Sequence, residues 1–227
     1  MAGFRMHMTV STVVGVGYGA AAVNPLGFSP AAGFLAAGLT ACGGMLPDLD
    51  SDSGAPVRHL SGVAAAVGPM LLVPRLQAAG IGHEALLCIL GGLYLAIRYG
   101  ASYVLKRVSV HRGMFHSIPA MLISGLVVYL EYDGPLRTRL LLGGGVMLGF
   151  LSHLVLDEVY SVDLYGARLK SSAGTAVKLF SPSIWANAVC YGLLGGLGFL
   201  AYGDWTMNAP PGAVPGAVGR SERFSRE

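Results

Sequence analysis

Apolar segments separated by polar turns run along most of the chain. Seven such segments lie at about residues 8–23, 31–46, 62–79, 84–105, 114–130, 139–157 and 184–202. A helix needs about 20 apolar residues to span a bilayer, within a usual range of about 17–25, and the last four segments reach this range. The first two are shorter and rich in Gly and Ala, so they form either short spans or a hairpin that the other helices shield. The pattern predicts an all-α, polytopic transmembrane bundle of about six to seven hydrophobic helices.

Turn-forming and polar residues mark the ends of these segments. The main breaks fall at Asn24-Pro25, at residues 47–56, at residues 106–112 and along residues 158–183. After Tyr202 the chain becomes rich in Gly and Pro and ends in scattered arginines, a composition typical of disorder. We therefore predict a membrane-embedded domain over residues 1–203 and a flexible C-terminal tail over residues 204–227.

The composition fits a protein whose solvent is lipid. Hydrophobic residues make up 53% of the chain, charged residues only 12%, and the mean hydropathy is +0.60. A soluble domain usually carries about 25% charged residues. The net charge of +3 comes with no basic stripe, so we expect membrane lipid and no nucleic acid as a partner. Cys42, Cys88 and Cys190 each lie in an apolar stretch and imply no disulfide.

Threading the segments alternately through a bilayer gathers most of the His and Asp residues on one face, which we call side A. His83 falls on the opposite face. Basic residues are concentrated in the side-A loops, so the positive-inside rule predicts that side A is the cytoplasmic face of an inner membrane. The first segment also imitates a secretory signal, whose cleavage would remove His7. The residues on side A are His7, Asp48, Asp50, His111, His116, His153 and Asp157.

The first motif is the acidic sequence LPDLDSD at residues 46–52. Carboxylates are hard oxygen ligands for divalent cations, and two of them together can hold or bridge metal ions. Asp48 and Asp50 directly follow an apolar helix, where unpaired acids are costly. The alternative is a solvated loop whose acids cap the next helix.

The second motif is HRGMFHS at residues 111–117. His111 and His116 do not share a straight helical face, but they can converge where a loop turns into a helix, and Gly113 permits such a turn. Neutral imidazole binds zinc, manganese or iron well, and Arg112 offers a planar fork for a phosphate. Ser117 caps a helix or hydrogen-bonds a ligand. The alternative is an amphipathic helix start at the membrane interface.

The third motif is His153-Leu-Val-Leu-Asp157 within an otherwise apolar helix. A spacing of i, i+4 places both side chains on one face, as two ligands of one metal or as a ligand and the carboxylate that orients it. The alternative is a buried hydrogen bond that only stabilises packing. His7 alone is a weak candidate for a metal ligand, and its position on side A with the other His and Asp residues strengthens it. Arg98 either snorkels to the surface or faces an anionic substrate.

The motifs together predict a divalent-metal site, with zinc or manganese suiting a mixed His/Asp ligand set. A metal there would polarise a substrate oxygen and activate a water, and Arg112 would stabilise the charge that develops on a phosphoester. One carboxylate, Asp50 by preference, would act as base.

At these residues the sequence resembles the YdjM family, described as LexA-regulated, membrane-bound, metal-dependent hydrolases. The shared pieces are His7, LPDLD at 46–50, HRGMFHS at 111–117, GFLSHLVLD at 149–157 and LFSP at 179–182. The departures are Met114-Phe115 before the second His, where Thr is frequent, and Ser51, where His is common. They leave the number of metals open. The family's distant likeness to zinc-dependent phospholipase C, which has an HxxxD element, is an analogy of fold.

These observations predict a membrane-bound metal-dependent hydrolase that acts on a phosphoester such as a lipid headgroup. The rival class, a metal-ion transporter or sensor, would need polar residues that continue to the other face. A third class is a membrane protein with a purely structural polar cluster. In the hydrolase, Arg112, Ser117 and Arg98 would contact substrate, Asp50 and Arg112 would be catalytic, and the metal would bind His7, Asp48, Asp50, His111, His116, His153 and Asp157.

Overall fold

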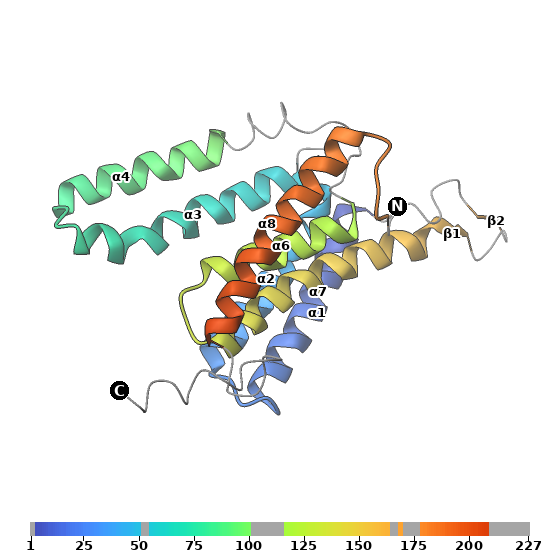
Figure 1. Ribbon diagram of the computed structural model, residues 1–227, viewed down its shortest axis with the longest axis horizontal. Coiled ribbons are helices and arrows are strands. Elements are labelled where there is room, and N and C mark those ends of the chain that lie inside the picture. The colour runs from blue at the N-terminus through green and yellow to red at the C-terminus, as the bar shows by residue number, and fades with distance from the viewer. Residues whose placement is uncertain (1–2, 51–54, 101–115, 164–167, 170–177, 209–227) are drawn as a thin grey trace, which may run out of the picture.

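The chain folds into helices that are joined by turns and one short β-ribbon (Figure 1). The computed structural model describes residues 3–50, 55–100, 116–163, 168–169 and 178–208. The α-helices are α1 (Phe4–Val23), α2 (Pro30–Gly43), α3 (Ala55–Ala78), α4 (His83–Leu95), α6 (Ile118–Glu131), α7 (Leu136–Ser161) and α8 (Ile184–Asn208). The shorter elements are the 3-10 turn η1 (Pro47–Asp50), the π-helical turn η2 (Ala96–Gly100) and the paired strands β1 (Val162–Asp163) and β2 (Arg168–Leu169). The predicted all-α class is confirmed.

Among the described residues, the helices α1, α7 and α8 are long and apolar enough to cross a membrane, and α2, α6 and residues 61–70 of α3 form shorter apolar stretches. The predicted count of six to seven spans is not confirmed. In the apolar segment 84–105, α4 ends at Leu95 and the π-helical turn follows to Gly100, and residues 101–105 lie outside the described residues.

The boundary predicted at residue 203 falls inside α8, which continues to Asn208. The sequence DWTMN after Gly203 contains no Gly or Pro to interrupt the helix, and the Gly/Pro-rich composition begins only beyond it. The predicted flexible tail, at residues 209–227, lies outside the described residues.

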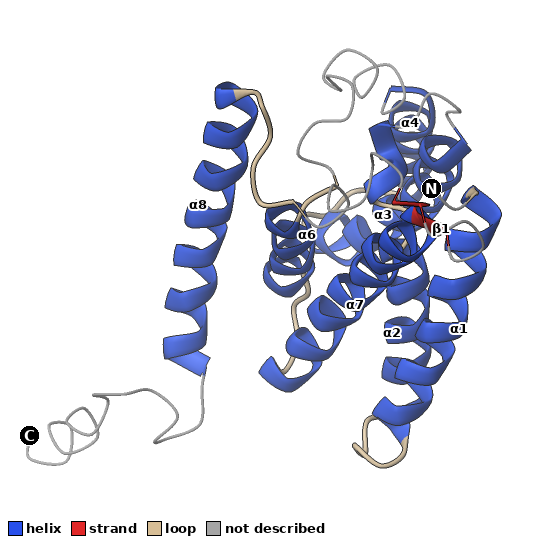
Figure 2. Ribbon diagram, turned by 90° about the vertical axis from the view of Figure 1, so that its right-hand side faces the viewer, coloured by secondary structure: helices blue, strands red, loops and turns tan. Residues whose placement is uncertain are grey.

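Helices α1, α2 and α7 form the closest-packed part of the bundle, and α6 lies on the other side of α7 (Figure 2). Helix α8 packs against α6, whereas α3 and α4 pack mainly on each other and project from the bundle (Figure 1). Ala22, Ala36, Leu141 and Leu142 form the buried apolar cluster where α1, α2 and α7 meet.

Two helices begin with the same local signal, a serine cap followed by proline in the first turn. Ser29 accepts a hydrogen bond from the N–H of Ala32 at 3.2 Å at the start of α2, and Ser117 accepts one from Ala120 at 3.2 Å at the start of α6. Such caps satisfy a backbone donor that the first helical turn leaves unpaired. The start of α6, directly after His116, is therefore encoded locally.

Glycines let the backbones of α1, α2 and α7 touch. A methyl group at Gly149 of α7 would overlap the carbonyl of Thr40 in α2, and one at Gly43 would overlap the carbonyl of Val146. In α1, a methyl group at Gly19 would likewise overlap the carbonyl of Gly33. Small residues at helix contacts are how membrane helices gain packing energy, since lipid gives them no hydrophobic driving force.

A buried ionic network ties α6, α7 and α8 together near the start of α7. Arg139 donates hydrogen bonds to the carbonyl of Tyr129 at 2.9 Å and to the carboxylate of Asp204 at 2.8 Å. The hydroxyl of Tyr129 donates to the same carboxylate at 2.7 Å. An arginine among membrane helices is costly unless it is paired, so this network compensates the charge within the bundle.

We predict that Gly149→Ala disrupts the α2–α7 contact. Overpacking of a tight contact costs about 1–3 kcal/mol, so the Tm of the purified chain in detergent should fall. The matched control is Gly196→Ala in α8, where an added methyl group meets nothing within 4 Å and the Tm should hold or rise slightly. Equal Tm values for the two variants would contradict the packing described here.

Candidate metal centre

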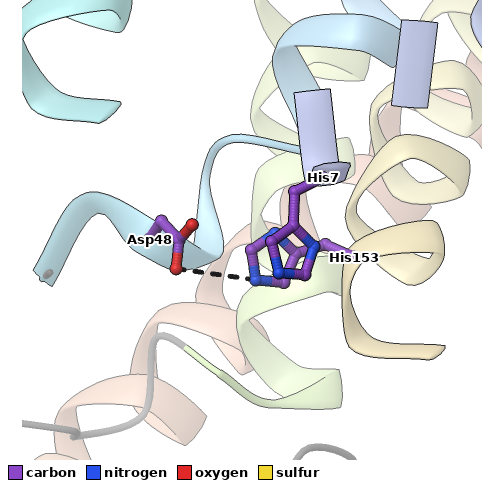
Figure 3. Close-up of side chains that lie close together, drawn as sticks. All are labelled: His7, Asp48 and His153. Carbon is purple, nitrogen blue, oxygen red and sulfur yellow. Dashed lines mark ion pairs between the residues drawn. The ribbon is translucent and has the colours of Figure 1, made fainter. Parts of the chain in front are cut away.

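His7, Asp48 and His153 converge from three elements that are distant in sequence (Figure 3). His7 lies in the first turns of α1, Asp48 in η1 just after α2, and His153 in the second half of α7. The imidazoles of His7 and His153 stack with ring centroids 3.6 Å apart and planes 12° apart. Nε2 of His153 lies 3.6 Å from Oδ1 of Asp48.

Two further side chains complete the cluster. Oδ2 of Asp157 lies 3.7 Å from Nε2 of His153 and 4.0 Å from Nε2 of His116. Oδ1 of Asp157 lies 3.1 Å from Nε2 of His7, and Nε2 of His116 lies 3.7 Å from Oδ1 of Asp48. We call these five side chains the His/Asp cluster: His7, Asp48, His116, His153 and Asp157.

The cluster is enclosed. His7 and Asp157 are each 3% exposed and His153 is 1% exposed, while Asp48 and His116 lie closer to the surface. Buried carboxylates and imidazoles are expensive in an apolar bundle unless they pair with one another or with a metal ion. The partly exposed side, formed by Asp48 and His116, is where a substrate can approach.

A backbone hydrogen bond fixes the state of His153. Its Nδ1 lies 2.8 Å from the carbonyl oxygen of Gly44, which can only accept, so Nδ1 carries the proton. The lone pair of Nε2 then points into the cluster, and this buried atom has no hydrogen-bond partner among the described residues. A histidine held by a carbonyl on one nitrogen and open on the other has the arrangement of a metal ligand.

In His7 the two ring nitrogens have the reverse roles: Nε2 contacts a protein oxygen, and Nδ1 is left open. A proton on its Nε2 would be donated to Asp157, and Nδ1 is then left with a lone pair that no described residue satisfies. Unsatisfied buried polar atoms are rare in proteins, so two of them in one cluster suit a bound cation.

The described side chains outline one candidate metal site. Two groups have ligand atoms within 4.8 Å of one another, His7 with Asp48 and His153, and His116 with His153 and Asp157. Both groups contain His153, and its other nitrogen is occupied by Gly44. One lone pair binds one metal, so the groups are two overlapping parts of the same centre.

The carboxylate of Asp48 is suited to bind a cation. Burial raises its pKa, but the hydrogen-bonding contact with His116 and the electrostatic effect of the neighbouring imidazoles outweigh burial and hold the pKa below its usual value. Asp48 is therefore ionised at neutral pH and offers a negatively charged oxygen.

The other predicted site residues lie apart from the cluster or outside the described part of the chain. Asp50 lies in η1, but its side chain is not described, and His111 and Arg112 fall outside the described residues. Ser117 is fully buried and caps α6. Arg98 reaches Ser61 of α3 at 3.4 Å, and no described ion pair joins it to the cluster.

Sequence reasoning missed the strand-like contact beside His116. Ser117 pairs in parallel with Lys178, and the N–H of Ile118 donates to the carbonyl of Lys178 at 3.2 Å. The LFSP motif directly after Lys178 was the only hint in the sequence that this segment has a fixed position. A single β-bridge produces no alternation of polar and apolar residues, so the sequence pattern could not predict it.

The family described as YdjM inner membrane protein matches residues 1–187, and the chain therefore belongs to this family. The resemblance drawn from the motifs is thus confirmed, and the matched region contains the whole cluster. No curated protein and no solved structure matches the chain.

We predict that His153→Ala weakens zinc binding by at least about 100-fold, because it removes the ligand that both groups share. Competition with a chelator, on the full chain in detergent, measures this. His83→Ala is the matched control, since His83 begins α4 and lies outside both groups, and its zinc affinity should equal that of the unaltered chain. Equal affinities in both variants would place the zinc elsewhere.

Proposed function

We propose that this member of the YdjM inner membrane protein family is a metal-dependent hydrolase whose substrate is a phosphoester. The observation that carries the proposal is a pair of buried imidazole nitrogens that have no hydrogen-bond partner among the described residues, in a cluster that also holds two carboxylates. A cluster that served only to stabilise the fold would provide hydrogen-bond partners for these nitrogens, because each buried polar atom left without one costs about 1–3 kcal/mol of stability.

The His/Asp cluster would hold a divalent ion, with zinc or manganese fitting its nitrogen and oxygen donors. Such an ion would act as a Lewis acid on the phosphoryl group and lower the pKa of a water until it can attack at neutral pH. Gly44 keeps His153 in the ligand tautomer, and Asp157 orients His7. The enclosed side of the cluster keeps bulk water away.

Residues near the open side would handle the substrate. Asp50, in the same turn as Asp48, is the candidate base, and Arg112, close before His116 in sequence, is the candidate for binding the anion. A base on η1 would stand beside the metal, where it can take a proton from the attacking water. These roles rest on the sequence motifs, because neither side chain is described.

A transporter fits the arrangement less well. Between the cluster and the ionic network of Arg139, the buried face of α7 presents Leu142, Val146 and Phe150, which are apolar. A cation crossing the bundle needs successive oxygen or nitrogen ligands. The hydroxyls beside this stretch, those of Ser11, Tyr18 and Thr40, each donate to a backbone carbonyl, and no described carboxylate or imidazole lies among them.

We further propose that the cluster faces the cytoplasm. Lys178 lies beside the start of α6, and most of the basic loop residues of the chain belong to the same end by sequence. Excess Lys and Arg in short loops marks the cytoplasmic face.

We predict that the metal-loaded chain hydrolyses a phosphoester when phospholipids and polyprenyl phosphates are screened, and that a chelator abolishes the reaction. Asp48→Asn keeps the side-chain shape but removes a charged ligand, so the rate should fall by at least about 100-fold. Glu84→Gln, an exposed acid in the first turn of α4, is the matched control and should keep full activity. Activity that persists in the chelator or in Asp48→Asn would refute the proposal.

A further inference from the structure

An exposed apolar surface lies at the start of α8 and in the turn that leads to it from Lys178. Leu179, Phe180, Ile184 and Trp185 are all exposed, Phe180 by 65% and Trp185 by 82%. We call these four residues the 179–185 wedge. Apolar surface in water costs about 25 cal/mol per Å², so a wedge of this kind needs an apolar environment.

The wedge is held in place by its own hydrogen bonds. Asn187 and Ser181 exchange two, each of 2.8 Å, and the hydroxyl of Tyr191 donates to the carbonyl of Leu179 at 2.9 Å. The rings of Phe180 and Tyr191 stack with centroids 5.3 Å apart. The exposed side chains thus lie on a turn that these hydrogen bonds hold in one conformation at the start of α8.

The same turn is attached to the metal centre. The Ser117–Lys178 bridge and the hydrogen bond from Ile118 to Lys178 fasten the start of the turn directly after His116, a member of the His/Asp cluster. Figure 2 shows the loop before α8 running from the end of that helix toward α6. The turn that carries the wedge is therefore anchored at one end to the segment that carries His116.

The environment that covers the wedge is the bilayer. The wedge is continuous with the exposed apolar surface of α8, a candidate membrane span with few buried residues. Tryptophan at the end of such a span is typical of the headgroup level, where its apolar ring meets lipid and its N–H meets water. A water-soluble substrate would need no such surface beside the site.

We propose that the metal centre receives its substrate sideways from the bilayer: a phospholipid whose chains rest on the 179–185 wedge and whose phosphate reaches the cluster past His116. This inference rests on the proposed function, and it adds the substrate class and the route. The wedge residues position the lipid and take no part in the chemistry.

The test measures whether a lipid phosphate reaches a metal in the cluster. The full chain is placed in nanodiscs of phosphatidylethanolamine and phosphatidylglycerol, in phosphate-free buffer, with one equivalent of Mn²⁺. Pulsed electron paramagnetic resonance then detects ³¹P nuclei next to the manganese. We expect ³¹P modulation from the lipid phosphate, and none for the chain in a phosphorus-free detergent until inorganic phosphate is added.

The double variant Phe180→Ala/Trp185→Ala should bind Mn²⁺ with unchanged stoichiometry and lose the lipid ³¹P modulation at least several-fold. It should still show modulation with inorganic phosphate in detergent. The matched control is Phe199→Ala/Tyr202→Ala, which removes two exposed aromatic side chains elsewhere on α8 and should behave like the unaltered chain.

The outcomes separate the two proposals. If Mn²⁺ binds but only inorganic phosphate gives ³¹P modulation, or if the wedge variant keeps the full lipid modulation, the lipid route is wrong and the metal centre stands. If no Mn²⁺ binds to the unaltered chain, the proposed function itself fails, and the lipid route fails with it.

Discussion

The contact between the backbones of α2 and α7 is the constraint on which the rest of the site depends. Gly149 allows α7 to approach Thr40 so closely that no side chain fits between the helices. This approach brings Nδ1 of His153 within 2.8 Å of the carbonyl of Gly44, which fixes the tautomer of His153 and directs Nε2 into the cluster. The turn after α2 then carries Asp48 to the same point. The close contact of α2 with α7, the hydrogen bond between His153 and Gly44 and the position of Asp48 therefore depend on one another.

The bundle contains two clusters of ionisable side chains, one toward each end of α7. The His/Asp cluster lies toward the end of α7, and the network of Arg139, Tyr129 and Asp204 lies toward its start. The network satisfies its charges internally through a guanidinium–carboxylate pair. The cluster is different, because two of its buried nitrogens find no hydrogen-bond partner among the described residues, an arrangement that suits the binding of a cation.

The sequence predicted the meeting of His7, Asp48, His116, His153 and Asp157, because alternate threading and the i, i+4 spacing of His153 and Asp157 follow from periodicity alone. The predicted count of six to seven spans stays unconfirmed, since three of the described helices are long and apolar enough to cross a membrane. The sequence also missed the pairing of Arg139 with Asp204, which lie 65 residues apart with no motif to link them. Contacts of that kind depend on how whole helices pack, which no local pattern specifies.

X-ray absorption at the zinc edge of the purified, zinc-loaded full chain tests most directly whether the His/Asp cluster is a metal centre. The predicted result is one zinc per chain, with a first shell of nitrogen and oxygen at about 2.0–2.2 Å and the outer-shell scattering of imidazole. A chain that retains no stoichiometric zinc, or a zinc ion coordinated mainly by cysteine sulfur, would contradict the assignment of the His/Asp cluster as a metal centre.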